Sequence, residues 1–209
     1  MHERAIPSTS QKLLDRLEAV NVPETKGWVL AGGTGLALQL GHRVSEDFDF
    51  FRTDDMDVRS LHCVLAQVGS YETLQEAEHT LTVLCMGIKL SFFRVRDPFV
   101  YKTVPYRFFH IASPREIALM KLIAIYGRGA RKDFVDLYTI LRGGESLRDL
   151  FQSLPEKYGQ GRANVYHILK SLTYFADAEE EPMPRLFEPF DWEECKRFFI
   201  REVRSSALG

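Results

Sequence analysis

The spacing of hydrophobic and polar positions along the chain predicts an α+β fold, with a mixed sheet flanked by helices and a mostly helical C-terminal part. Short apolar or alternating runs predict strands, and apolar residues three and four apart predict helices. The predicted strands are 28–31, 47–52, 71–75, 81–86, 88–95 and 106–112. The predicted helices outside the segment discussed next are 11–20, 57–68, 114–126, 131–142, 147–154, 165–175 and 192–203.

Residues 28–52 predict a strand, a tight turn, one helix and a second strand. The first strand ends in Gly32-Gly33, where a sharp turn needs a residue without a side chain. Thr34 is the expected cap of the helix, and Gly41 is expected to end it. The strands expected between residues 71 and 95 follow one another closely and therefore favour antiparallel pairing.

Asp47 and Asp49 lie two residues apart on the strand after this helix. Alternate residues of a strand share a face, so both carboxylates should project together while Phe48 and Phe50 turn into the core. Two neighbouring carboxylates repel unless positive charge lies close to them. Mg²⁺ binds hard oxygen ligands, commonly one or two carboxylates together with substrate phosphates. The pair therefore predicts a magnesium site that serves a nucleotide.

Charge and length limit the classes of protein that fit. The chain has 27 basic and 29 acidic residues, so it lacks the overall positive field of many nucleic-acid binders and any such contact must use a local patch. At 209 residues it can form one domain, alone or with a smaller appendage. The C-terminal helix carries Lys196, Arg197, Arg201 and Arg204, which form either a face for RNA phosphates or the solvated side of an ordinary amphipathic helix.

The chain also lacks the sequence features of a membrane or secreted protein. Its apolar runs are too short to span a bilayer, and its N-terminus lacks the pattern of a signal peptide, so we expect a cytoplasmic protein without membrane contact. Cys63, Cys85 and Cys195 are widely separated, which predicts neither a disulfide framework nor a zinc site. They are expected to be small core residues.

Two phrases resemble a known family. Gly33-Thr34, twelve further residues and then Asp47-Phe48-Asp49 resemble the signature of DNA polymerase β-type nucleotidyltransferases. The longer phrase from Gly32 to Phe51 is similar to the AbiEii/AbiGii toxin-type branch. The segment from Lys121 through Arg128-Gly129 to Arg131-Lys132-Asp133-Phe134-Val135-Asp136-Leu137-Tyr138 resembles the later motifs of that branch.

The resemblance implies a polymerase β-like nucleotidyltransferase core at residues 1–142 and a helical extension at 143–209. It implies an Mg²⁺-dependent enzyme that transfers a nucleoside monophosphate from a nucleoside triphosphate (NTP) to an acceptor, such as RNA and especially the tRNA 3′ end. It also implies a toxin with a cognate antitoxin protein as its partner.

The resemblance further assigns roles to single residues. Asp47 and Asp49 would hold the metal, and Lys121 would contact the phosphates. Asp133 and Asp136 are one helical turn apart and would hold Lys121 or help to place the acceptor. The implied catalytic set is Asp47, Asp49, Lys121, Asp133 and Asp136, and the implied nucleotide-binding set is Gly33, Thr34, Arg43 and Lys121.

One position departs from the family pattern. The wider superfamily usually carries a third carboxylate on a later strand, where this chain has Ser91, and a serine is a poor metal ligand beside an aspartate. Two alternatives therefore stay open. The chain is either a nucleotide-binding or partner-binding protein with weakened catalysis, or a transferase that modifies protein hydroxyl groups.

Overall fold

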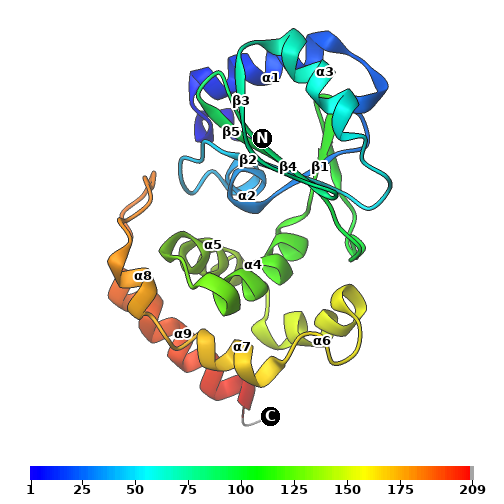
Figure 1. Ribbon diagram of the computed structural model, residues 1–209. Coiled ribbons are helices and arrows are strands. Elements are labelled where there is room, and N and C mark those ends of the chain that lie inside the picture. The colour runs from blue at the N-terminus through cyan, green and yellow to red at the C-terminus, as the bar shows by residue number, and fades with distance from the viewer. Residues whose placement is uncertain (208–209) are drawn as a thin grey trace. The chain divides into compact units, whose positions relative to one another are not determined.

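The computed structural model describes residues 1–207 (Figure 1). The chain forms two structural units, and the boundary between them lies at Ser113. The first unit, Met1–Ser113, contains the sheet, and the second, which begins at Pro114, is helical over its described residues. The sequence analysis expected the core to extend to residue 142. The structure instead groups α4 (Pro114–Arg128) and α5 (Arg131–Arg142) with the later helices, because both pack against those helices.

A seven-stranded mixed sheet forms the first unit, with the strand order β3-β4-β5-β2-β1-β7-β6. β2 pairs with β5 and β1 with β7 in parallel, and the other neighbours are antiparallel. The predicted antiparallel pairing of β3, β4 and β5 is confirmed. The strands are β1 (Val29–Ala31), β2 (Phe48–Arg52), β3 (Tyr71–Ala77), β4 (Thr80–Cys85), β5 (Ile88–Arg94), β6 (Val104–Tyr106) and β7 (Phe109–Ile111).

The segment predicted as one strand at 106–112 is a hairpin. β6 and β7 pair antiparallel, with Tyr106 opposite Phe109. The turn passes through Arg107, whose φ of 50° lies in the left-handed region. No glycine or asparagine marks this turn, so the prediction of a single strand was wrong.

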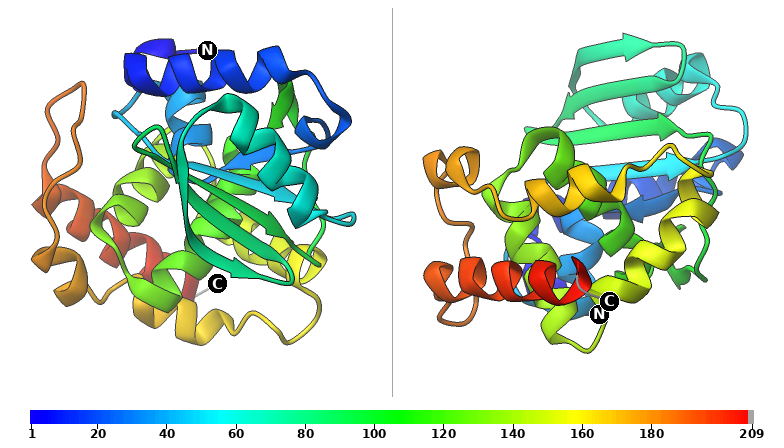
Figure 2. Two further views of the ribbon diagram at one scale, coloured as in Figure 1. Left: turned by 45° about the horizontal axis from the view of Figure 1, so that its top comes forward. Right: turned by 90° about the horizontal axis from the view of Figure 1, so that it is seen from below.

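One face of the sheet carries the main hydrophobic core. Phe48 and Phe50 of β2 and Leu90 and Phe92 of β5 are buried there with apolar residues of α1 and α3. Figure 2 shows these two helices on one face of the sheet, and they contact each other. Because side chains alternate along a strand, Asp49 and Ser91 point to the opposite face. The helical segments of this unit are η1 (Glu3–Ala5), α1 (Ser8–Val20), η2 (Pro23–Thr25), α2 (Gly32–Leu40) and α3 (Val58–Val68).

The second unit is built around α4 and α5, which pack against each other and against the later helices. Its aromatic core centres on Phe134, whose ring centroid lies 5.2 Å from that of Phe175, 6.0 Å from that of Trp192 and 5.5 Å from that of Phe199. The helix predicted at 165–175 ends early, at Ser171. The remaining helices are α6 (Leu147–Tyr158), α7 (Val165–Ser171), α8 (Ala176–Glu180) and α9 (Trp192–Ala207).

Two expectations on the class of protein can be compared with the structure. Within residues 1–207 no helix is both long and apolar enough to cross a membrane. The cysteines Cys63, Cys85 and Cys195 are all free. Cys85 and Cys195 are buried, but Cys63 is exposed on α3, so the prediction that all three belong to the core was wrong for Cys63.

Candidate active site

The glycine turn brings the start of α2 against Asp49. α2 begins at Gly32, directly after β1, and Gly32 has a left-handed φ of 63°. A Cβ at Gly32 would lie only 3.0 Å from Oδ2 of Asp49, and a Cβ at Gly33 would collide with the guanidinium group of Arg43. Any side chain in this turn would therefore displace one of these two charged groups.

Thr34 does not cap α2, as the sequence analysis expected. The helix begins two residues earlier, and its N-cap is Ala31, which makes no side-chain capping hydrogen bond. The Thr34 side chain is buried, and its hydroxyl donates to the backbone carbonyl oxygen of Asp47 and lies 2.8 Å from the hydroxyl of Ser45. Thr34 thus fixes the loop that leads into β2 and positions Asp47.

Asp49 is the second residue of β2, and Asp47 lies directly before this strand, which was predicted to begin at Asp47. Asp49 lies opposite Ala31 of β1 and opposite Ser91 of β5. The intervening Phe48 is fully buried, and the Asp47 side chain is 44% exposed. The two carboxylates therefore share the face of the sheet opposite the hydrophobic core, where a solvent-borne ligand can reach Asp47.

β5 contributes two residues beside this pair. The register sets Ser91 next to Asp49, at the position that the sequence analysis aligned with the third carboxylate of the wider superfamily. Nζ of Lys89 lies 3.0 Å from Oδ2 of Asp47. The sequence analysis missed Lys89, because this ion pair depends on the register between two strands 40 residues apart. The only signal in the sequence was the position of Lys89 two residues before Ser91, which puts both on one face.

Arg43 supplies a second positive group near the turn. Its side chain is buried, and Nη1 donates to the backbone carbonyl oxygen of Val44, 3.1 Å away. Its guanidinium group also occupies the space beside Gly33 at the start of α2. A helix N-terminus favours anions, and the adjacent guanidinium group adds to this preference.

The second motif forms a buried charge cluster within the helical unit. Nζ of Lys121 on α4 lies 2.7 Å from Oδ1 of Asp133 and 2.6 Å from Oδ2 of Asp136, both on α5. The Lys121 side chain is 6% exposed and the two carboxylates are fully buried. The structure thus brings Asp133 and Asp136 against Lys121, and their role in the reaction stays a prediction. Arg128 also contacts Asp133, with Nε 2.8 Å from Oδ2.

These contacts favour the charged forms of Lys121 and Asp133. Burial acts to lower the pKa of Lys121, but the attraction of Asp136 and Asp133 outweighs it and leaves this pKa above its ordinary value. Burial acts to raise the pKa of Asp133, but Lys121 and Arg128 outweigh it and leave this pKa below its ordinary value. The cluster is therefore a set of mutually compensating charges in the interior of the unit.

A family model described as "Nucleotidyl transferase AbiEii toxin, Type IV TA system" matches residues 12–207. The chain belongs to the AbiEii nucleotidyltransferase toxin family. The protein aq_aa25 of Aquifex aeolicus (strain VF5), described as uncharacterized, is 35% identical over 207 residues, covering 96% of this chain and 97% of that protein. The predicted family is thus confirmed.

Two solved structures share the fold over most of this chain. JHP933 from Helicobacter pylori matches with a TM-score of 0.54 and 16% identity, over 99% of this chain and 90% of that one. The nucleotidyltransferase toxin MenT4 from Mycobacterium tuberculosis matches with a TM-score of 0.50 and 18% identity, over 93% and 81%. The AbiEii-family chain therefore has the nucleotidyltransferase fold predicted from its sequence.

The carboxylates of this AbiEii-family chain fit a divalent ion that takes some ligands from the protein and the others from a nucleotide. Among residues 1–207, no group of three or more His, Cys, Asp or Glu side chains is arranged to hold a metal. Asp47 and Asp49 alone supply two neighbouring carboxylates, which is the usual protein share of a Mg²⁺ site completed by phosphates and water. The residues therefore fit an ion that arrives with its nucleotide, rather than a metal held only by protein.

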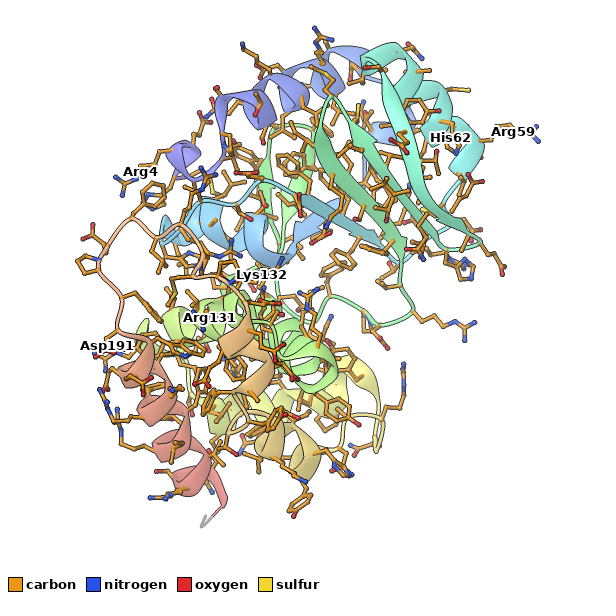
Figure 3. The ribbon with its side chains drawn as sticks, turned by 60° about the vertical axis from the view of Figure 1, so that its left-hand side comes forward. Arg4, Arg59, His62, Arg131, Lys132 and Asp191 are labelled. Atoms are coloured by element: carbon orange, nitrogen blue, oxygen red, sulfur yellow. The ribbon has the colours of Figure 1, made fainter. Side chains whose placement is uncertain are left out.

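The basic residues near the C-terminus are mostly paired with acidic ones. Arg131, labelled in Figure 3, donates to the carbonyl oxygens of Ala178 and Glu179, so it ties α5 to α8. On α9, the ion-paired residues are Lys196 with Glu179 and Glu193, Arg197 with Asp191 and Glu194, and Arg201 with Glu194. Of the two open interpretations of α9, this pairing favours the ordinary amphipathic helix over a face for RNA.

Proposed function

We propose that the chain is an Mg²⁺-dependent enzyme that transfers a nucleoside monophosphate from an NTP to an RNA acceptor, such as the tRNA 3′ end. The observation that carries the proposal is the pair Asp47 and Asp49 beside the glycine turn at the start of α2. Carboxylates for an ion and backbone N–H groups for phosphates are thereby side by side.

The N-terminal N–H groups of α2 and the guanidinium group of Arg43 would bind the phosphates of the NTP. Asp47 and Asp49 would hold Mg²⁺, which when bound lowers the negative charge of the triphosphate and fixes its geometry. Thr34 holds the Asp47 backbone and so orients the first carboxylate. Most of the rate enhancement would come from this positioning and from charge compensation.

The reaction is a displacement at the α-phosphorus. The acceptor hydroxyl oxygen forms a bond to that phosphorus and its proton passes to water. The bond from the α-phosphorus to the oxygen of the β-phosphate breaks, and pyrophosphate leaves with the electron pair. The family motif assigns a phosphate contact to Lys121. In the free protein its ammonium group lies 2.7 Å from Asp133 and 2.6 Å from Asp136.

The family model names a toxin of a type IV toxin–antitoxin system. We propose an antitoxin protein as the partner and RNA as the target of the modification. Transfer to the 3′ end of a tRNA would stop translation, which accounts for toxicity with a single chemical step.

Incubation of the protein with labelled NTPs, Mg²⁺ and total tRNA tests the proposal directly. The parent protein should label tRNA, whereas Asp47→Asn should not. Asp55→Asn is the matched control, because the Asp55 side chain is 95% exposed. Its ion pair is with Arg94, at 3.1 Å. Absence of label with the parent, or equal labelling by Asp47→Asn, would contradict the proposal. Label on co-expressed protein rather than on RNA would identify a protein hydroxyl as the acceptor.

A second function is favoured by Ser91, which stands next to Asp49 in place of a carboxylate. If this site has lost turnover, the chain would bind an NTP and Mg²⁺ without transferring the nucleotide. Calorimetry that detects magnesium-dependent NTP binding, combined with no labelled product after long incubation, would support this second function.

A further inference from the structure

Two residues of β5, Lys89 and Ser91, lie beside the carboxylates of Asp47 and Asp49. Phe48 lies opposite Leu90, and Asp49 lies opposite Ser91. Asp47 comes directly before Phe48 in the chain, and Lys89 comes directly before Leu90. Nζ of Lys89 forms an ion pair with Oδ2 of Asp47, 3.0 Å away. β5 therefore sets a hydroxyl beside Asp49 and an ammonium group beside Asp47.

We propose that Lys89 takes the place of a second divalent ion, so that this site binds one divalent ion per nucleotide, on Asp47 and Asp49. The inference rests on the proposed nucleotide site. It adds a residue that contacts the substrate and fixes the metal stoichiometry of that site.

The charges around the pair support one ion rather than two. Two-metal sites hold their ions about 3.5–4 Å apart, so both ions must approach the same carboxylates. A second ion bound to Oδ2 of Asp47 would stand close to the Lys89 ammonium group and be repelled by it. Ser91 adds no negative charge to offset this repulsion. Two carboxylates with one lysine and one divalent ion have the same net formal charge as three carboxylates with two divalent ions.

Lys89 is also free to change partners. Its side chain is 41% exposed and that of Asp47 is 44% exposed. Exposed ion pairs contribute little to stability, and the four-carbon stem of lysine is flexible. In the free protein Lys89 relieves the repulsion between Asp47 and Asp49. When an NTP arrives with its ion, the ion takes over this role and the ammonium group turns to the phosphates.

The experiment measures bound Mn²⁺ and bound nucleotide together, by equilibrium dialysis with the α,β-methylene analogues of the four NTPs, which cannot be transferred. The parent should bind one Mn²⁺ per bound nucleotide. Lys89→Gln should bind the analogues about tenfold more weakly, because a charge-assisted contact to phosphate is lost. Without nucleotide, the same variant should bind Mn²⁺ more tightly than the parent, because no ammonium group competes for Asp47.

The double variant Lys89→Gln, Ser91→Asp should bind two Mn²⁺ per nucleotide, because it restores a third carboxylate and removes the competing charge. Lys89→Arg should recover part of the affinity for the analogues. Lys12→Gln, which removes an exposed lysine of α1, is the control and should match the parent in every measurement. A thermal melt of each variant confirms that it is folded.

The outcomes separate this inference from the proposed function. Two Mn²⁺ per nucleotide in the parent, or a Lys89→Gln variant that binds Mn²⁺ and analogue as the parent does, would overturn the inference and leave the proposed function standing. No binding of analogue by the parent would remove the proposed function, and the role of Lys89 with it.

Discussion

Replacement of Lys121 by methionine tests whether the second motif is part of the structural core of the helical unit. Methionine keeps most of the apolar stem and removes the ammonium group. Two fully buried carboxylates, those of Asp133 and Asp136, would then lose the ammonium group that they share, while the contact between Asp133 and Arg128 would remain. Breaking a buried ion pair by removing one partner costs about 3–5 kcal/mol. For a chain of this size, that corresponds to a fall of roughly 6–20 °C in the melting temperature.

The pH dependence of this loss follows from the pKa shifts. The pKa of Asp133 is lowered in the folded state, so its contribution is present above its unfolded value of about 3.9 and is lost as the pH falls through the folded value. The pKa of Lys121 is raised, so its contribution is present below its unfolded value of about 10.4 and is lost as the pH rises through the folded value. The difference in stability between parent and Lys121→Met should therefore be largest near neutral pH and smaller near pH 3.

Urea denaturation at both pH values measures the difference in the free energy of unfolding. Lys132→Met is the matched control, because Lys132 directly precedes Asp133 on α5 but is exposed (Figure 3). Its effect should stay within about 0.5 kcal/mol. A loss below about 1 kcal/mol for Lys121→Met at neutral pH, or a loss that grows towards acid pH, would refute the reasoning.

Three further substitutions test single contacts by thermal or urea denaturation. Gly33→Ala should cost about 1–3 kcal/mol and weaken nucleotide binding, because its Cβ displaces the arginine side chain that lies there; unchanged binding would contradict this. Thr34→Val should cost about 1–3 kcal/mol and lower transferase activity by releasing the Asp47 loop, whereas Thr34→Ser should keep both. Lys157→Met should cost about 3–5 kcal/mol, because Nζ lies 2.5 Å from Oε1 of the fully buried Glu116. The double variant Lys157→Met, Glu116→Leu should recover most of that loss, and equal stabilities of the single and double variants would contradict it.

The local features of the first unit could be predicted from the sequence. The spacing of two between Asp47 and Asp49, with phenylalanines between and after them, determines both the strand and the shared face of the carboxylates. Gly32 could be identified as a tight turn because only glycine adopts its φ without strain. These predictions depend on residues within a few positions of one another, and over such short distances the alternation of side chains along a strand is enough to tell which residues share a face.

Features that depend on packing between distant segments could not be predicted. The hairpin of β6 and β7 turns through Arg107, a residue with no preference for a left-handed φ. The unit boundary at Ser113 follows from the packing of α4 and α5 against later helices, although the family motifs span both sides of that boundary. The cap assigned to Thr34 was misplaced because α2 begins three residues earlier than a cap at Thr34 requires.

The two lysines show why a sequence motif alone does not determine which cation binds phosphate. Lys121 belongs to the recognised motif, yet its side chain is 6% exposed and two carboxylates surround its ammonium group. Lys89 belongs to no motif, yet its side chain is 41% exposed and contacts only one carboxylate among the ion pairs of the first unit. A phosphate must displace the existing partners of a lysine before it can bind. That exchange costs less at the exposed pair than at the buried cluster, because water already screens the exposed charges. Substitution of Lys89 should therefore lower nucleotide affinity with little effect on stability, whereas substitution of Lys121 should first lower stability.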